Sequence, residues 1–215
     1  MTPVNWQKMP AEKSHTGILT FYYSSDKAEV PTRGVDKLKD HKRDPNFETR
    51  TYGLFTDCNQ RMRKAAVREG RNILFFMTSW RGRRYVTGFM RIGWFAEVTL
   101  NENLERGYAL KADRMFLAFP PLPFFGNGPH TKFNAGNISY SGIVGSGPLR
   151  GAAKLDQDST LALINALMKR RMATNQYIRE LHRLEDENLK RFEYRYPDIH
   201  KVEQFSESDI KKYLF

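Results

Sequence analysis

The stretch NILFFMTSWRGRRYVTGFMRIGWF, residues 72–95, decides the fold. Residues 72–79 form a largely apolar run rich in aromatic and branched side chains, and residues 85–95 form a second such run. These compositions are typical of β-strands. The residues between them, RGRR at 81–84, have the composition of a short turn. The stretch therefore predicts an antiparallel hairpin with a basic tip.

Upstream of this hairpin the sequence predicts a strand and a helix. Residues 18–23 (ILTFYY) have strand composition and lead into a polar turn, while residues 27–50 carry charges, Pro and Gly and are expected to be loop. Tyr52 to Phe55 is a short apolar run. Asp57 and Gln60 have the spacing of a capping box, and Gly70 supplies a stop, so a helix is expected between them. Its inward residues would be Met62, Ala65 and Ala66.

Downstream, a strand is expected over 114–119, ended by three prolines that cannot donate to a ladder: Pro120, Pro121 and Pro123. Residues 125–151 contain seven glycines and are predicted to be loop. A long helix is then expected to start at Asp158 or Ser159, with apolar residues recurring at helical steps at Leu161, Ile164, Leu167, Met172, Ile178, Leu181 and Leu184. A short terminal helix is expected from Ser206.

Composition bounds the class of protein. The 215 residues suit one globular domain with a helical tail, and 35 Lys and Arg against 24 Asp and Glu leave a net charge of +11. Such a surplus attracts polyanions, above all nucleic acid. The one cysteine, Cys58, fits a reducing compartment, and neither a secretory signal nor an apolar run of roughly 20 residues is seen. The sequence thus predicts a cytoplasmic protein outside the membrane.

A cluster of basic residues is the strongest physical signal. Between Cys58 and Arg91 one acid, Glu69, stands against nine Lys or Arg: Arg61, Arg63, Lys64, Arg68, Arg71, Arg81, Arg83, Arg84 and Arg91. Arginine pairs with phosphate through a planar fork, and such contacts bind the backbone without reading bases. The alternative is a solvated helix face and a solubilising hairpin tip.

Aromatic residues are interleaved with this charge. Aromatic faces stack on unpaired bases, although core packing is the better explanation for Phe21, Phe75 and Phe89. Trp80 differs, because it lies at a strand end and strict alternation cannot place both Trp80 and Arg81 inside. Trp80 is therefore a candidate site residue.

Catalytic signatures are weak. The five histidines lack metal-ligand spacing, and no metal or cofactor is implied. Cys58, near a predicted helix start, is a conceivable nucleophile but more often such a cysteine is a packing residue. Asp26 and Asp57 could act as acid or base, yet nothing pairs them. Enzymatic activity stays open, with a binding module favoured.

The order of these elements resembles the YTH and EVE branch of the PUA-like superfamily, which includes nucleotide-modification-associated domains of prokaryotes. The likeness covers residues 17 to 170 and is best in the block 52–92. It implies an α+β fold, a small twisted β-barrel flanked by helices, to which the long C-terminal helix is added. The domain would span 17–170, between an extension at 1–16 and a helical tail at 171–215.

The resemblance also implies a site in which a flipped, modified base enters an aromatic pocket. By position, its lining would be Tyr22, Tyr23, Ser24, Ser25, Asp26, Tyr52, Thr78, Ser79 and Trp80, with Trp94 a candidate second cage residue. The phosphate-binding residues would be Arg61, Arg63, Lys64, Arg81, Arg83 and Arg84.

The function expected from the sequence is recognition of a modified or flipped base in DNA or RNA, without turnover. One alternative is an enzyme of nucleotide or base modification. Another is an assembly protein that forms a homodimer, or binds a partner protein, through its C-terminal helix.

Overall fold

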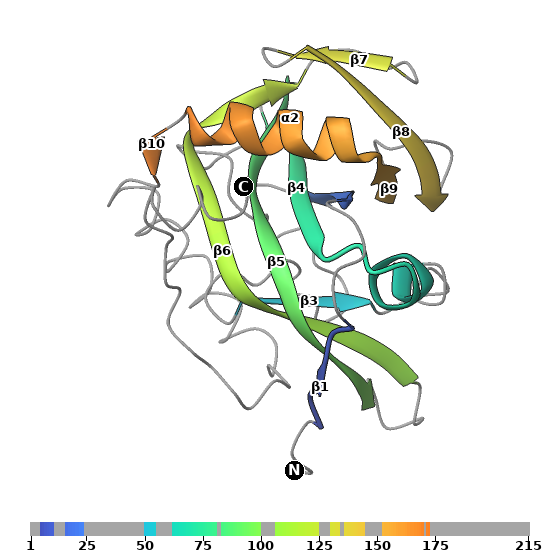
Figure 1. Cartoon of the computed structure of the whole chain (residues 1–215). Helices are drawn as coiled ribbons and strands as arrows, with labels where there is room; N and C mark the ends of the chain where they lie inside the picture. Colours follow the sequence, from blue (N-terminus) through green and yellow to red (C-terminus); the bar gives the residue numbers. More distant parts are fainter. Residues whose placement is uncertain are drawn as a thin grey trace.

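The structure is a computed structural model. It describes residues 5–10, 16–23, 50–54, 62–80, 83–99, 106–124, 130–133, 136–144, 152–169 and 171–172. Within these ranges the chain is mixed α+β, as expected, and strands predominate (Figure 1).

Ten strands and two helical segments make up the described part. The strands are β1 (Gln7–Lys8), β2 (Gly17–Tyr23), β3 (Thr51–Leu54), β4 (Ile73–Trp80), β5 (Arg83–Thr99), β6 (Arg106–Phe124), β7 (His130–Phe133), β8 (Gly136–Val144), β9 (Ala152–Leu155) and β10 (Arg171–Met172). The helical segments are η1 (Lys64–Arg68), a π-helical turn, and α2 (Gln157–Met168).

The strands form one sheet in the order β1-β5-β4-β2-β9-β8-β7-β6-β10, and β5 additionally pairs with β6 while β3 pairs with β6. The predicted hairpin is confirmed as the antiparallel pair β4–β5. The predicted strand over 18–23 is confirmed as β2, which runs parallel to β4. Only Phe124 with Phe133 joins β6 to β7 among the described residues, so the expected small barrel is not confirmed.

Two apolar clusters lie on opposite faces of the sheet, because alternate residues of each strand belong to different clusters. The first cluster contains Leu74, Phe76 and Met90 and packs against the helical turn. The predicted inward residues of that turn are confirmed as buried: Met62, Ala65 and Ala66. Gly70 ends it with φ of 68°, as its sequence position suggested.

The second cluster is covered by α2, which lies across β4, β5 and β6 in Figure 1. Leu163, Ile164 and Leu167 pack there with Phe89 and Phe116. The helix begins at Gln157, one or two residues earlier than expected. Its N-cap is Asp156, whose Oδ1 accepts a hydrogen bond from the Ser159 backbone N–H at 2.7 Å.

The expected continuous long helix is wrong. Helix α2 ends at Met168, and Arg171–Met172 then form β10 against Phe119 and Ala118 of β6. The later apolar residues of the predicted helix, and the predicted terminal helix, lie outside the described residues.

The predicted end of a strand at Phe119 is also wrong, because β6 continues through its prolines to Phe124. Gly88 pairs with Leu117 and Val86 pairs with Leu122, so residues 118–121 of β6 bulge opposite a single residue of β5. Pro120 and Pro121 lie in this bulge, where a missing N–H donor removes no ladder bond to β5. A bulge thus absorbs the residues that were expected to terminate the strand.

The glycine-rich segment is not all loop. Strands β7 and β8 occupy 130–133 and 136–144 within it, and β8 pairs with β9. The composition obscured the larger residues of β8, which are interspersed with Gly and Ser along its sequence GNISYSGIV. Neighbouring strands supply the hydrogen bonds that make this a strand despite two glycines.

The predicted N-terminal extension, residues 1–16, is part of the sheet through its described residues. In the predicted N-terminal extension, β1 pairs with β5 and Met9 is buried in the first cluster. No helix in the described part of the chain is long and apolar enough to cross a membrane.

Candidate nucleic-acid interface

Several residues of the predicted base pocket are neighbours in space. The parallel register of β2 and β4 sets Tyr22 beside Thr78 and Tyr23 beside Ser79, although each pair is 56 residues apart in sequence. Across the hairpin, Ser79 pairs with Arg84. The structure therefore sets the ends of β2 and β4 side by side, which is where the resemblance places part of the pocket.

Two of these side chains are part of the core. Tyr22 is 2% exposed and Thr78 is fully buried. The Tyr22 hydroxyl lies 2.9 Å from Thr87 Oγ1, and Thr78 Oγ1 donates to the Tyr22 carbonyl at 2.8 Å. Their polar groups are satisfied within the protein, so packing and internal hydrogen bonds account for both residues.

Tyr52 is half-buried against the same cluster. Its hydroxyl lies 2.8 Å from Thr20 Oγ1, and its ring centroid lies 6.2 Å from that of Phe76. Strand β3 holds it there by pairing Tyr52 with Leu110 of β6.

The rest of the predicted pocket is described only in part. The backbones of Trp80 and Arg83 pair at the end of the hairpin. The structure does not describe three side chains of the predicted site, those of Tyr23, Trp80 and Arg83. Also outside the described residues are Ser24, Ser25, Asp26, Arg61 and Arg81, and the conceivable nucleophile Cys58.

Trp94 lies on the other face of the sheet from Tyr52. It pairs with Lys111 of β6, whereas Tyr52 pairs with the next residue, Leu110, which is buried in the first cluster. Residues directly opposite one another share a face, and successive residues of a strand alternate. The structure therefore does not bring these two predicted cage residues together.

On its own face Trp94 is flanked by cations. Lys8 of β1 pairs with it on one side and Lys111 of β6 on the other. Trp6, two residues before Lys8, shares this face, and its ring centroid lies 5.4 Å from Lys111 Nζ, a cation–π contact. Lys8 is exposed, and Trp6, Trp94 and Lys111 are each half-buried.

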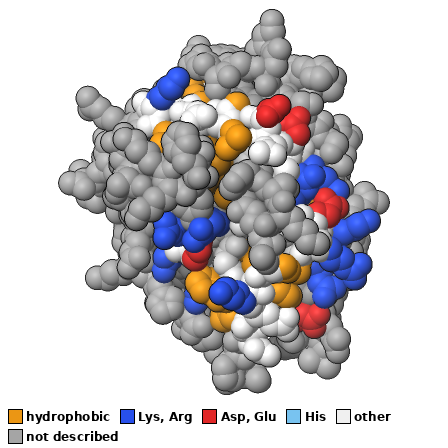
Figure 2. Space-filling model, in the orientation of Figure 1, with side chains coloured by type: hydrophobic (Ala, Val, Ile, Leu, Met, Phe, Trp, Pro, Cys, Tyr) orange, Lys and Arg blue, Asp and Glu red, His pale blue; other side chains and the backbone are white. Residues whose placement is uncertain are grey.

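Two arginines extend this surface along β5 and β6. Arg91 pairs directly with Arg114, and the neighbours Met90 and Met115 are buried in the first cluster, so both arginines face the other way. We call the set Trp6, Lys8, Arg91, Trp94, Lys111 and Arg114 the β1–β5–β6 face. In the lower half of Figure 2, basic side chains lie beside hydrophobic ones over the region where Figure 1 shows these strands.

Among the described residues, Asp113 moderates the charge of the face. The Asp113 carboxylate accepts from Arg91 Nε at 2.8 Å and also from Arg91 Nη2, while Arg50 Nη1 donates to the Asp113 carbonyl at 3.2 Å. A bidentate pair fixes the guanidinium plane. The β1–β5–β6 face thus has four cations, and one of them is oriented by Asp113.

The predicted phosphate-binding residues of the helical turn lie elsewhere. Arg63 is half-buried and Lys64 exposed, next to the turn that packs on the first cluster. The turn that carries them therefore packs on the side of the sheet opposite the β1–β5–β6 face.

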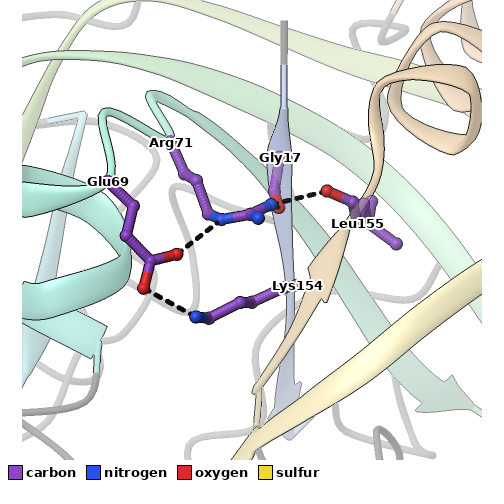
Figure 3. Close-up of polar contacts among 5 residues, drawn as sticks. All are labelled: Gly17, Glu69, Arg71, Lys154 and Leu155. Atoms are coloured by element: carbon purple, nitrogen blue, oxygen red, sulfur yellow. Dashed lines mark hydrogen bonds and ion pairs between the residues drawn. The ribbon is translucent and has the colours of Figure 1, made fainter. Parts of the chain in front are cut away.

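A third group of charges joins separate elements of the fold (Figure 3). Arg71 Nη1 donates to the carbonyls of Leu155 at 2.6 Å and Gly17 at 3.4 Å, and Arg71 Nε donates to Glu69 Oε2 at 3.0 Å. Lys154 Nζ lies 2.7 Å from Glu69 Oε1. These contacts tie β2, β9 and the start of β4 together, which is a structural role.

The environment of Glu69 changes its pKa. Burial raises the pKa of this carboxyl, but hydrogen bonds from Lys154 and Arg71, with their positive charges, outweigh that effect and hold the pKa below its ordinary value of 4.5. Glu69 is therefore a carboxylate that is stabilised in its charged form.

The residues missed from the sequence are Trp6, Lys8, Lys111 and Arg114. Trp6 and Lys8 have no local signal, because only the pairing of β1 with β5 carries them to the site. Lys111 could have been found if the strand expected over 114–119 had been extended upstream, since Lys111 alternates with the buried Leu110 and Ala112. Arg114 began that expected strand but lies outside the cluster of basic residues between Cys58 and Arg91.

Within the described ranges no group of three or more His, Cys, Asp or Glu could hold a metal ion. Comparisons of the chain with protein-family models, with curated proteins and with solved structures each found no match.

Proposed function

We propose that this protein binds nucleic acid. The observation that carries the proposal is the β1–β5–β6 face, where Trp94 lies between Lys8 and Lys111 and next to a pair of arginines. Lysine and arginine neutralise phosphates, and an indole ring offers a surface on which a base can stack. The net charge of +11 adds long-range attraction for a polyanion.

The finer form of the proposal is a PUA-like domain that reads a modified or flipped base. The β5–β6 pairing together with the pairing of Phe124 in β6 with Phe133 in β7 supports a barrel-like closure of the sheet. The adjacency of Tyr23, Ser79 and Arg84 at the ends of β2 and β4 supports a pocket there. In this form, extrusion of the base would precede its recognition by polar and aromatic groups.

The experiment is a salt-titrated binding assay with fluorescent oligonucleotides, in which DNA and RNA, single strands and duplexes, and plain and base-methylated forms are compared. A linear fall of log affinity with log salt concentration would support nucleic-acid binding. A preference for one methylated base would support the reader. Affinity for no oligonucleotide at low salt would refute the proposal.

A further inference from the structure

We infer that the β1–β5–β6 face binds single-stranded nucleic acid, with an unpaired base stacked on Trp94 and adjacent phosphates held by Lys8 and Lys111. The inference rests on the proposed function and names its ligand. It also gives each residue of the face a separate role.

The arrangement of the row favours a single strand. Adjacent strands lie roughly 4.8 Å apart, so Lys8, Trp94 and Lys111, which are directly paired across β1, β5 and β6, place one cation on each side of the ring. A ring with a cation on each side suits a ligand that can place a base on the ring and its neighbouring phosphates on the cations at the same time. In a duplex the base faces are already stacked, and an indole on a sheet surface cannot reach them.

The extent of the face fits the same ligand. Arg114 continues the positive charge along β6, away from the Lys8–Trp94–Lys111 row, next to Arg91, whose charge is paired with that of Asp113. Sheet surfaces that carry aromatic side chains are a recurrent platform for unpaired bases. The charge and the ring together are complementary to a chain of alternating phosphate and base.

Trp6 is a positioning residue in this account. The cation–π contact of 5.4 Å holds the Lys111 ammonium over the Trp6 ring, beside Trp94. A lysine that is held in place loses less side-chain entropy when it binds a phosphate than one that is free to rotate. Removal of Trp6 should therefore weaken binding through Lys111.

The other charged groups of the face are consistent with this division of roles. Asp113 is engaged by Arg91, which limits its repulsion of a phosphate near Lys111. The carboxylate of Glu69 does not belong to the face. It accepts hydrogen bonds from Arg71 and Lys154, which also lie outside the face.

The test uses the full chain with a short fluorescent poly-dT strand and a hairpin duplex as probes. Trp94→Ala should weaken binding of the single strand by about 5-fold to 150-fold, and Trp94→Phe should restore most of it. Lys8→Gln and Lys111→Gln should each reduce the slope of log affinity against log salt by about 0.7. Lys169→Gln, which removes an exposed charge at the end of α2, is the matched control and should change neither quantity.

A double-mutant cycle tests the role of Trp6. Trp6→Ala should weaken binding in the wild-type background and have little effect when Lys111 is already glutamine. An equal loss of affinity in the wild-type and Lys111→Gln backgrounds would show that Trp6 does not act through Lys111. Far-UV circular dichroism and thermal melts of each variant separate loss of binding from loss of folding.

The outcomes distinguish this inference from the broader proposal. Salt-dependent binding that is as tight for the duplex as for the single strand, or that Trp94→Ala leaves unchanged in a folded variant, would overturn the single-strand inference and leave nucleic-acid binding intact. Lys8→Gln gives an independent check, because Lys8 is exposed and its replacement should not impair folding. Absence of binding to every probe would overturn both.

Discussion

Tyr52 and Trp94 lie on opposite faces of the same region of the sheet. Tyr52 pairs with Leu110 and Trp94 with Lys111, and these are successive residues of β6. The first ring packs against the core and the second lies among lysines. Two aromatic residues that the sequence suggested for one cage therefore have separate surroundings, and their substitutions should have separate effects.

Tyr52→Phe should lower stability and leave binding of a single strand unchanged. The substitution removes the hydroxyl that bonds with Thr20 Oγ1, and the net loss should be about 0.5–1.5 kcal/mol in the free energy of unfolding. Urea denaturation measures the first effect and the poly-dT assay the second. If binding falls while stability holds, Tyr52 contacts the ligand and the division between faces fails.

Arg71→Ala should be clearly destabilising. The side chain donates to two backbone carbonyls of different strands, Gly17 and Leu155, and to Glu69. Its loss removes hydrogen bonds to two partly buried carbonyls and to Glu69, at a cost of about 1–3 kcal/mol in the free energy of unfolding. Chemical denaturation at neutral pH measures it. The control Arg68→Ala, at an exposed position of η1, should cost much less, and equal losses would contradict the structural role of Arg71.

Glu69 should make stability depend on pH on the acid side. Because its pKa in the folded protein is below 4.5, the stabilisation is present above that ordinary value. It is lost as the pH falls below 4.5 and through the lowered pKa, since protonation then favours the unfolded chain. Unfolding free energies measured from neutral pH down to the acid range should fall less steeply for Glu69→Gln than for the wild type. Parallel curves would show that the Lys154 and Arg71 contacts contribute nothing to this dependence.

Gly88→Ala should be one of the most damaging single substitutions in the sheet. A Cβ at this position would lie 2.1 Å from the Phe116 carbonyl oxygen and 3.0 Å from Leu117 Cα, both backbone atoms. The strands would have to separate at the bulge, and overpacking of this kind costs about 1–3 kcal/mol or more. Gly93→Ala, whose Cβ would meet the Asp113 side chain at 3.1 Å, is the milder comparison. Thermal melts that rank the two in the reverse order would contradict this packing.

The parts of the fold that were predictable are those with local signals. The hairpin and β2 follow from apolar runs, and the buried face of the helical turn follows from the spacing of Met62, Ala65 and Ala66. Strand β6 was predicted too short because its prolines are strand breakers unless a bulge accommodates them, and the bulge depends on the register with β5. The end of α2 was missed because apolar residues recur beyond Met168 without an obvious stop.

The site was predictable only in part, for a related reason. Trp94 was a candidate through the family resemblance, but its neighbours Trp6 and Lys8 are about 90 residues away in sequence and reach it through β1. Which face a residue takes also depends on bulges: the register shifts on both sides of Ile92 determine that Trp94 lies with Lys111. Such tertiary pairings are not encoded in any single stretch.

The most direct test of the central claim is the salt dependence of poly-dT binding by the wild type and Trp94→Ala. Our account predicts that log affinity of the wild type falls linearly with log salt, and that the folded Trp94→Ala variant binds at least about 5-fold more weakly at every salt concentration with the same slope, because a ring and not a charge has been removed. Equal affinities of the two proteins, or no salt-dependent binding by the wild type, would contradict it.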